Sequence, residues 1–139
     1  MDRSGFSLTP GSRRVDKPWG HEILLSPEDA PYTAKLIHVR AGHRLSLQYH
    51  DSKTETQTLV SGQGILVLED ASGTLHEVPM QTGVGYSVAI GQVHRLCAAP
   101  DRDAVIYEAS TPETGTTFRL EDDYDRHDET ETERRQERQ

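Results

Sequence analysis

The chain has 139 residues, of which 33% are hydrophobic and 27% are charged, and its formal net charge is −8. This length suits one domain, and the low hydrophobic content predicts that part of the chain stays outside the core. The negative charge argues against nucleic acid as a partner, because it repels a phosphate backbone. The single cysteine, Cys97, excludes an internal disulfide and any cysteine-rich zinc site.

No stretch of the sequence reaches the roughly 18 consecutive apolar residues that a membrane-spanning helix needs. The N-terminal residues also lack the apolar segment of a signal peptide. We therefore expect no membrane partner. A single cysteine suits a reducing compartment, so the expected location is the cytoplasm.

The composition divides the chain into three expected segments. Residues 1–14 contain Gly, Ser, Pro and Arg without periodicity, which predicts a flexible arm or an edge strand that orders on a partner. Residues 15–126 are expected to form the folded domain. Residues 127–139 contain no apolar residue, which predicts a disordered charged tail.

Between the two ends, short apolar runs alternate with turn residues, as is typical of an all-β sandwich or barrel. In chain order, the predicted strands are 21–25, 33–40, 43–50, 55–61, 64–70, 74–80, 85–90, 93–98, 104–110 and 116–120. Their connectors are short enough for hairpins. The turn glycines that suit a positive φ are Gly42, Gly62, Gly73 and Gly91. The sequence therefore predicts an all-β barrel of antiparallel hairpins.

Four polar residues in this pattern are candidate metal ligands. Gln48 and His50 share one face of their strand, because successive strand residues point to opposite faces. Glu55 begins the next predicted strand, where it is expected beside His50 across a hairpin. His94 opens a separate strand after its own tight turn. Two imidazoles, a carboxylate and an amide oxygen suit zinc, manganese, iron(II), nickel or cobalt, with positions left open for a substrate.

Two stretches of the chain resemble the two motifs of the cupin superfamily. Residues 42–62 resemble the first motif, with Gln48 in place of its first histidine, and residues 85–96 resemble the second. Three further stretches are similar to the type II phosphomannose isomerase group: KPWGHE at 17–22, SLQYH at 46–50 and FRLEDDYDR at 118–126. Together the resemblance covers about residues 15–126.

The resemblance implies a single cupin domain, a double-stranded β-helix or jelly-roll barrel. It also implies a metal bound by Gln48, His50, Glu55 and His94, and a homodimer. In such dimers the N-terminal strands are often exchanged, which would involve Phe6 and Leu8 in the arm. The chain departs from the isomerase pattern at Lys53, Gln57, Ala89, Ala98 and Asp125. These departures concern the substrate more than the metal.

The function that the resemblance implies is metal-dependent aldose–ketose isomerisation of a phosphorylated hexose, of the mannose 6-phosphate/fructose 6-phosphate type, through an enediolate. The metal would acidify the C2 proton as a Lewis acid, and one base would move it between C2 and C1. Candidate catalytic residues are Lys35, Glu22 and Arg126. A phosphate group needs guanidinium or ammonium partners, for which Lys53, Arg95 and Arg119 are the candidates.

Two other functions remain open. The first is a non-haem iron(II) cupin dioxygenase acting on a small organic substrate, in which His50, Glu55 and His94 form the facial triad and Gln48 stays loose. The second is a sugar-binding cupin without turnover. For the four candidate ligands themselves, the alternative is a set of hydrogen-bonded polar residues in a barrel that has lost its metal. Oxygen-dependent consumption of substrate with iron would favour the first. Tight sugar binding without turnover would favour the second.

Overall fold

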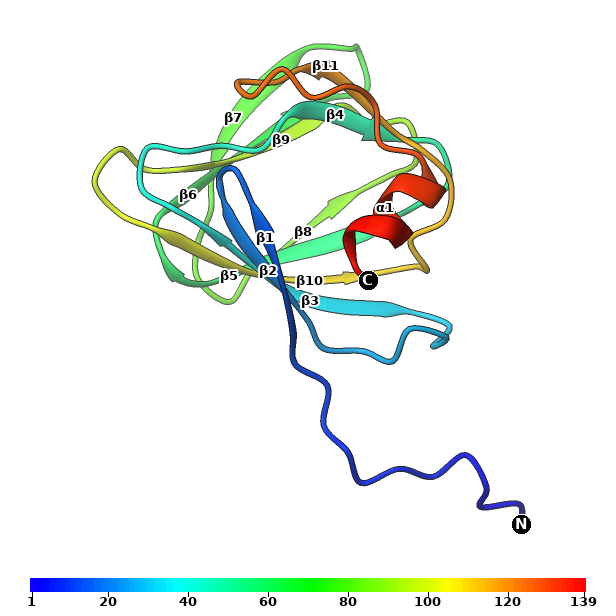
Figure 1. Cartoon of the computed structure of the whole chain (residues 1–139). Coiled ribbons are helices and arrows are strands. Elements are labelled where there is room, and N and C mark those ends of the chain that lie inside the picture. The colour runs from blue at the N-terminus through cyan, green and yellow to red at the C-terminus, as the bar shows by residue number, and fades with distance from the viewer.

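The computed structural model describes residues 1–139 and is nearly all β, as the sequence predicts (Figure 1). The strands are β1 Arg13–Lys17, β2 Gly20–Leu24, β3 Thr33–Val39, β4 Leu47–His50, β5 Glu55–Gly62, β6 Gly64–Glu69, β7 Leu75–Pro79, β8 Gly85–Val88, β9 His94–Ala98, β10 Ala104–Ser110 and β11 Thr117–Glu121. One helix, α1, spans Glu131–Glu137 near the C-terminus. None of the helical structure is both long and apolar enough to cross a membrane.

The strands form two sheets that close around a common interior (Figure 1). One sheet has the order β1-β2-β3-β10-β5-β8, and the other has the order β11-β4-β9-β6-β7. All neighbouring strands pair antiparallel, as expected. The predicted hairpin between residues 43–50 and 55–61 is wrong, because β4 and β5 lie in different sheets. The connector after His50 therefore crosses from one sheet to the other, and Glu55 faces His50 across the barrel interior.

The barrel interior has an apolar end and a polar end. Alternation turns every second strand residue inward, and along a strand these inward residues change from apolar to polar. On β3, Lys35 and Ile37 are both buried on the inner face, and on β10 the same holds for Ile106 and Glu108. The apolar core consists of Trp19, Ile37, Val39, Leu59, Leu66, Met80, Leu96, Ala104 and Ile106. The polar end, one step further along the same strands, is therefore supported by a packed core.

Glycine permits the tight connection from β5 to β6. Gly62 has a φ of +84°, and a Cβ atom here would lie 1.8 Å from the carbonyl oxygen of Asp103. Any other residue would therefore clash with the backbone and strain the turn. The positive φ that the sequence predicts is found at this residue and at Gly42, Gly73 and Gly91.

The two ends of the chain differ from each other. The arm up to Ser12 extends away from the barrel, and its Phe6 and Leu8 are exposed (Figure 1). At the other end, residues 127–139 are not the disordered tail expected from the sequence, because α1 forms there. Thr130 caps this helix by accepting a hydrogen bond from the backbone N–H of Glu133. The helix contributes no apolar contact, and ion pairs described below hold it instead.

Candidate metal centre

Three buried side chains converge at the polar end of the barrel. His50 ends β4, Glu55 begins β5 and His94 begins β9. The carboxylate atom Oε1 of Glu55 lies 3.3 Å from Nε2 of His50 and 2.9 Å from Nε2 of His94. One ligand atom from each residue lies within 4.8 Å of the other two. The two sheets thus bring a two-histidine, one-carboxylate cluster together.

The imidazoles of His50 and His94 form hydrogen bonds through Nδ1, and their Nε2 atoms, which face Glu55, remain available to bind a ligand. Nδ1 of His94 lies 3.0 Å from the carbonyl oxygen of Gln92, which only accepts, so Nδ1 carries the proton and Nε2 keeps its lone pair. Nδ1 of His50 lies 2.9 Å from Oγ1 of Thr117. Nε2 of both rings and Oε1 of Glu55 are buried without a hydrogen-bond partner. Unsatisfied buried acceptors aimed at one point fit a divalent cation, and the outer hydrogen bonds orient its ligands.

The ionisation of this cluster also suits a cation. Burial lowers the pKa of His50 to about 4, which keeps its imidazole neutral near pH 7. Burial of Glu55 opposes its ionisation, but the ammonium group of Lys53, 3.3 Å away, holds the pKa of Glu55 well below its ordinary value. His50 therefore presents a neutral nitrogen donor and Glu55 a negative oxygen donor, the forms that metal binding requires.

The expected fourth ligand, Gln48, lies next to this cluster. It pairs with His94 across β4 and β9, and it lines the same cavity as His50. Its Oε1 accepts a hydrogen bond of 2.9 Å from Oγ of Ser46. The alternation predicted for this strand is present, because Tyr49 points the other way and stacks on Phe118. A ligand role for Gln48 remains a prediction.

A buried charge network surrounds the cluster, made of Glu22, Lys35, Lys53, Glu108 and Glu113. Nζ of Lys35 lies 2.8 Å from Glu22 and 3.2 Å from Glu113. Nζ of Lys53 lies 3.3 Å from each of Glu55, Glu108 and Glu113. Ionisable groups are tolerated in an interior when each has close partners, as these five residues have.

The network shifts the pKa values of two of its carboxyl groups, those of Glu22 and Glu108, in opposite directions. Burial opposes the ionisation of Glu22, but Lys35 and then Lys17 lower its pKa to about 2. Burial and the neighbouring carboxylate of Glu55 raise the pKa of Glu108 to about 8. An ionised carboxylate and a protonated carboxylic acid therefore flank Lys35, whose Nζ also lies 3.6 Å from Glu108. This combination of a proton acceptor and a proton donor is typical of acid–base catalysis.

Most of the residues that the sequence suggested for catalysis or substrate binding lie around one cavity. The cavity measures about 60 Å³. The predicted residues that line it are Glu22, Lys35, Gln48, His50, Lys53, Arg119 and Arg126. Nε of Arg119 is buried without a hydrogen-bond partner. The guanidinium of Arg126 pairs with Asp122 at 2.8 Å.

Arg95 is the exception among these residues. It follows His94 on β9, so its side chain leaves the opposite face of the strand and does not line the cavity. Its Nε donates to the carbonyl oxygen of Leu45 at 2.9 Å, and Nη1 lies 3.3 Å from Glu121. The structure thus places Arg95 outside the cavity, where it links the segment before β4 to the end of β11.

Other residues at the site were missed by the sequence analysis. Glu108 could have been found from the alternation on β10, which puts it on the inner face with Ile106. Glu113 lies in a loop and Arg134 lies in the C-terminal helix, and no local pattern connects either residue to the barrel. Thr117 is recognisable only through its contact with His50.

Residues 7–128 match the family model described as mannose-6-phosphate isomerase C-terminal. No curated protein sequence matches the chain significantly.

Several solved structures share the fold. The capsular polysaccharide assembling protein CapF from Staphylococcus aureus has a TM-score of 0.65 and 14% identity, over 94% of this chain and 36% of CapF. Bacillus subtilis oxalate decarboxylase, described with Mn(II) centres, has a TM-score of 0.66 and 17% identity, over 78% of this chain and 30% of that enzyme. KdgF from Halomonas sp. has a TM-score of 0.60 and 14% identity, over 70% of this chain and 83% of KdgF.

The chain spans about a third of the length of CapF, and identities this low show the fold alone. The barrel, the two motifs and these structural neighbours confirm the cupin fold. The match over residues 7–128 covers nearly the whole folded part of the chain. This cupin therefore belongs to the mannose-6-phosphate isomerase C-terminal family.

Proposed function

We propose that this cupin is a metal-dependent aldose–ketose isomerase acting on a phosphorylated hexose of the mannose 6-phosphate/fructose 6-phosphate type. The observation that carries the proposal is the free ligand set of His50, Glu55 and His94 beside the buried carboxyl groups of Glu22 and Glu108, which both contact Lys35. The family match supports this choice of reaction. A divalent ion held by these residues and Gln48 would polarise the substrate oxygens at C1 and C2 as a Lewis acid.

Isomerisation moves a proton between C2 and C1, and the residues around Lys35 suit this transfer. Glu22 is ionised, and its Oε1 is buried without a hydrogen-bond partner, so it can accept a proton. Glu108 keeps a proton near neutral pH and can donate one. Lys35 contacts both carboxyl groups and holds them in place. We assign the base to Glu22, the acid to Glu108 and their orientation to Lys35.

The phosphate group needs cationic donors along the cavity wall. Arg119 supplies a buried Nε without a partner, and β11 places this residue directly opposite Gln48 on β4. Arg126 lines the same cavity and offers a second guanidinium. We assign phosphate binding to Arg119 and Arg126, and electrostatic support near the reacting atoms to Lys53.

A homodimer in the cytoplasm remains part of the proposal. The outer face of the six-stranded sheet carries an uncharged row that pairs across the strands, made of Ile23, Leu36, Tyr107 and Thr58. In a chain with a net charge of −8, this row is a part of the surface where two copies could meet without placing like charges directly against each other. Cys97 is free, which suits a reducing compartment.

One observation favours a second candidate, a non-haem iron(II) dioxygenase. The side-chain oxygen of Gln48 is engaged by Ser46, whereas the ligand atoms of His50, Glu55 and His94 are free. A two-histidine, one-carboxylate set with open positions is the ligand pattern of such enzymes.

The proposed function is tested by adding mannose 6-phosphate in D₂O to protein loaded with zinc, manganese, cobalt or iron(II), followed by proton NMR. The proposal predicts fructose 6-phosphate and loss of the C2 proton signal. The Glu22→Gln variant should still bind metal but should exchange the C2 proton much more slowly. Unchanged sugar with metal bound would contradict the proposal. Oxygen uptake with iron would then favour the dioxygenase.

A further inference from the structure

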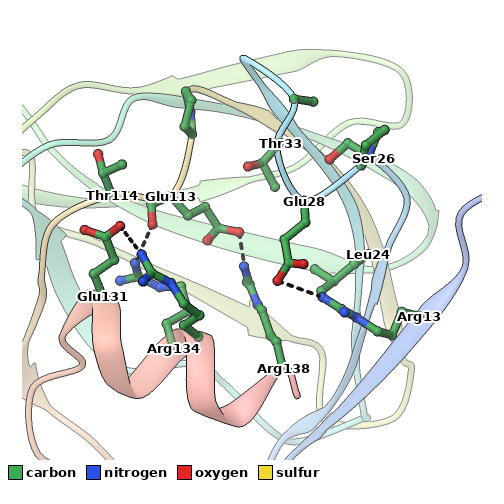
Figure 2. A pocket seen from close by; sticks show the side chains of 14 residues that line it. Arg13, Leu24, Ser26, Glu28, Thr33, Glu113, Thr114, Glu131, Arg134 and Arg138 are labelled. Carbon is green, nitrogen blue, oxygen red and sulfur yellow. Dashed lines mark hydrogen bonds and ion pairs between the residues drawn. The ribbon is translucent and has the colours of Figure 1, made fainter. Parts of the chain in front are cut away.

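Helix α1 lies against the polar end of the barrel, far in sequence from the strands that it covers (Figure 1). Figure 2 shows Arg134, on this helix, and Arg138, the residue that caps its C-terminus, pointing toward Glu113. Although its segment contains no apolar residue, Arg134 is only 6% exposed. The helix therefore inserts charged side chains into the barrel mouth.

Two arginines make the main contacts of α1. Arg134 donates to the carbonyl oxygen of Glu113 at 2.8 Å, to Oε1 of Glu129 at 2.9 Å and to Oγ1 of Thr117 at 3.3 Å. Arg138 donates to Oε1 of Glu113 at 2.8 Å. An ion pair between Lys17 and Glu137 adds a third attachment. Since these attachments are ionic or hydrogen-bonded, the helix is held by charge rather than by apolar burial.

These contacts reach the partners of two candidate metal ligands. Thr117 receives the contact from Arg134, and the same Oγ1 lies 2.9 Å from Nδ1 of His50. Glu113 pairs with Arg138 on one side and with Lys53 on the other, and Lys53 contacts Glu55. The position of α1 is therefore linked to His50 through the hydroxyl of Thr117. It is linked to Glu55 through the ion pair between Glu113 and Lys53.

The cavity is small while α1 is in place. Its volume of about 60 Å³ is well below the roughly 300–1,000 Å³ of ordinary ligand pockets. A second hollow of about 170 Å³ lies between α1 and the connection from β2 to β3 (Figure 2). Glu113 lines both hollows, and Arg138 lines the outer one. The Glu113–Arg138 pair therefore stands between the two spaces, and moving α1 would join them.

We propose that α1 is an ionic lid on the cupin barrel, held shut by Arg134 and Arg138 and opened when these guanidinium groups lose their carboxylate partners. In the shut state the lid excludes molecules larger than a few waters from the cavity. An anionic ligand competes with Glu113 and Glu129 for the two arginines and so favours the open state. High salt has the same effect, because it screens ion pairs at the mouth. This lid does not depend on which reaction the cavity carries out.

The only tryptophan, Trp19, provides a probe of the lid, because it is 2% exposed and lines the cavity. Its fluorescence is quenched with acrylamide, a neutral quencher, in the full-length chain. The Arg134→Gln/Arg138→Gln double variant should be quenched severalfold more strongly than the wild type. Arg135→Gln is the matched control, because Arg135 is exposed and pairs only with Glu131 on its own helix. This control should behave as the wild type.

A second measurement covers the case in which the double variant does not fold. Quenching of the wild type should rise toward that of the open state as NaCl increases to about 1 M, where the screening length is about 3 Å. The backbone N–H groups of Thr117 and Glu129, which bond each other's carbonyl oxygens at 2.9 Å, should exchange with deuterium faster over the same range. The lid would be overturned if the folded double variant showed the quenching and exchange of the wild type. It would also be overturned if neither readout of the wild type changed across the salt series. Neither readout uses a substrate, so failure of the isomerase proposal would not affect them.

Discussion

Oε1 of Glu55 lies 2.9 Å from Nε2 of His94, although the two residues belong to different sheets of the barrel. Neither atom has a hydrogen-bond partner, and both side chains are buried. Buried acceptors that face each other in this way are costly unless a cation lies between them. A bound metal would therefore join the two sheets and stabilise the fold.

Metal binding should raise the thermal stability of the protein. Metal at about a hundredfold excess over its Kd stabilises the folded state by about 2.7 kcal/mol, provided that the unfolded chain does not bind it. For a domain of this size, we expect the unfolding midpoint to rise by about 10 °C. Scanning calorimetry with and without zinc or manganese measures the shift, and a chelator should reverse it. Equal midpoints in both conditions would count against a metal that joins the sheets.

Thr117 should influence metal affinity without being a ligand. Thr117→Val removes the hydroxyl that orients His50, and losing such an outer contact weakens metal binding by about 10- to 100-fold. Thr116→Val makes the same change at the next residue, outside this hydrogen bond, and should leave the affinity near that of the wild type. Competition with a chromophoric chelator gives both constants. Equal affinities for the two variants would show that this hydroxyl does not position His50.

Arg119 should discriminate between phosphorylated and unphosphorylated sugars. Removing a charge-assisted hydrogen bond costs about 1.5–3 kcal/mol, so Arg119→Ala should raise the KM for mannose 6-phosphate by about 10- to 100-fold. The KM for mannose should change little. Arg95→Ala is the control, because Arg95 lies outside the cavity and should affect stability rather than KM. A KM for mannose 6-phosphate that stays at the wild-type value in Arg119→Ala would place the phosphate elsewhere.

As far as Glu22 and Glu108 decide it, stability should be highest near pH 4.5 and fall on either side, because the network shifts the pKa values of these two groups in opposite directions. The folded-state pKa of Glu22, about 2, lies below its ordinary value of 4.5, so its contribution is present above pH 4.5 and is lost as the pH falls toward 2. The pKa of Glu108 is raised to about 8, so its contribution is present below pH 4.5 and is lost as the pH rises through 8.

Urea unfolding at a series of pH values measures these two effects. Glu22→Gln should flatten the stability profile between pH 2 and 4.5, and Glu108→Gln should flatten it between pH 4.5 and 8. The Glu22 variant should also lose about 3 kcal/mol at neutral pH, because Lys35 loses its closest partner. Profiles that keep both slopes in both variants would show that other groups control the pH dependence.

The sequence predicted the parts of this molecule that depend on local pattern. Alternation identified most of the strands and placed Gln48 and His50 on the inner face, and the motif spacing identified Glu55 and His94. It did not predict that β4 and β5 lie in different sheets, because a four-residue connector suits a hairpin as well as a crossing between sheets.

Local sequence pattern could not predict the features that depend on ion pairs between residues far apart in the sequence. Helix α1 shows a capping signal at Thr130 and Glu133 but no apolar face, so its stability depends on Glu113 and Glu129 outside the helix. Arg95 was proposed for substrate binding on the basis of its charge, which does not indicate the face of the strand from which a side chain projects. Its position directly after His94 does indicate that face, which is the one opposite to His94.

The most direct test of the account is the metal content of the wild type and of three single variants, His50→Ala, Glu55→Ala and His94→Ala. Each protein is loaded with cobalt(II), dialysed and measured by mass spectrometry for metal and by absorption for the ligand field. His43→Ala serves as the control, because His43 lies outside the cluster. The account predicts one ion per chain in the wild type and in the control, and loss of the ion in each of the three cluster variants. A wild type that binds no ion, or cluster variants that bind it as tightly as the wild type, would contradict the account.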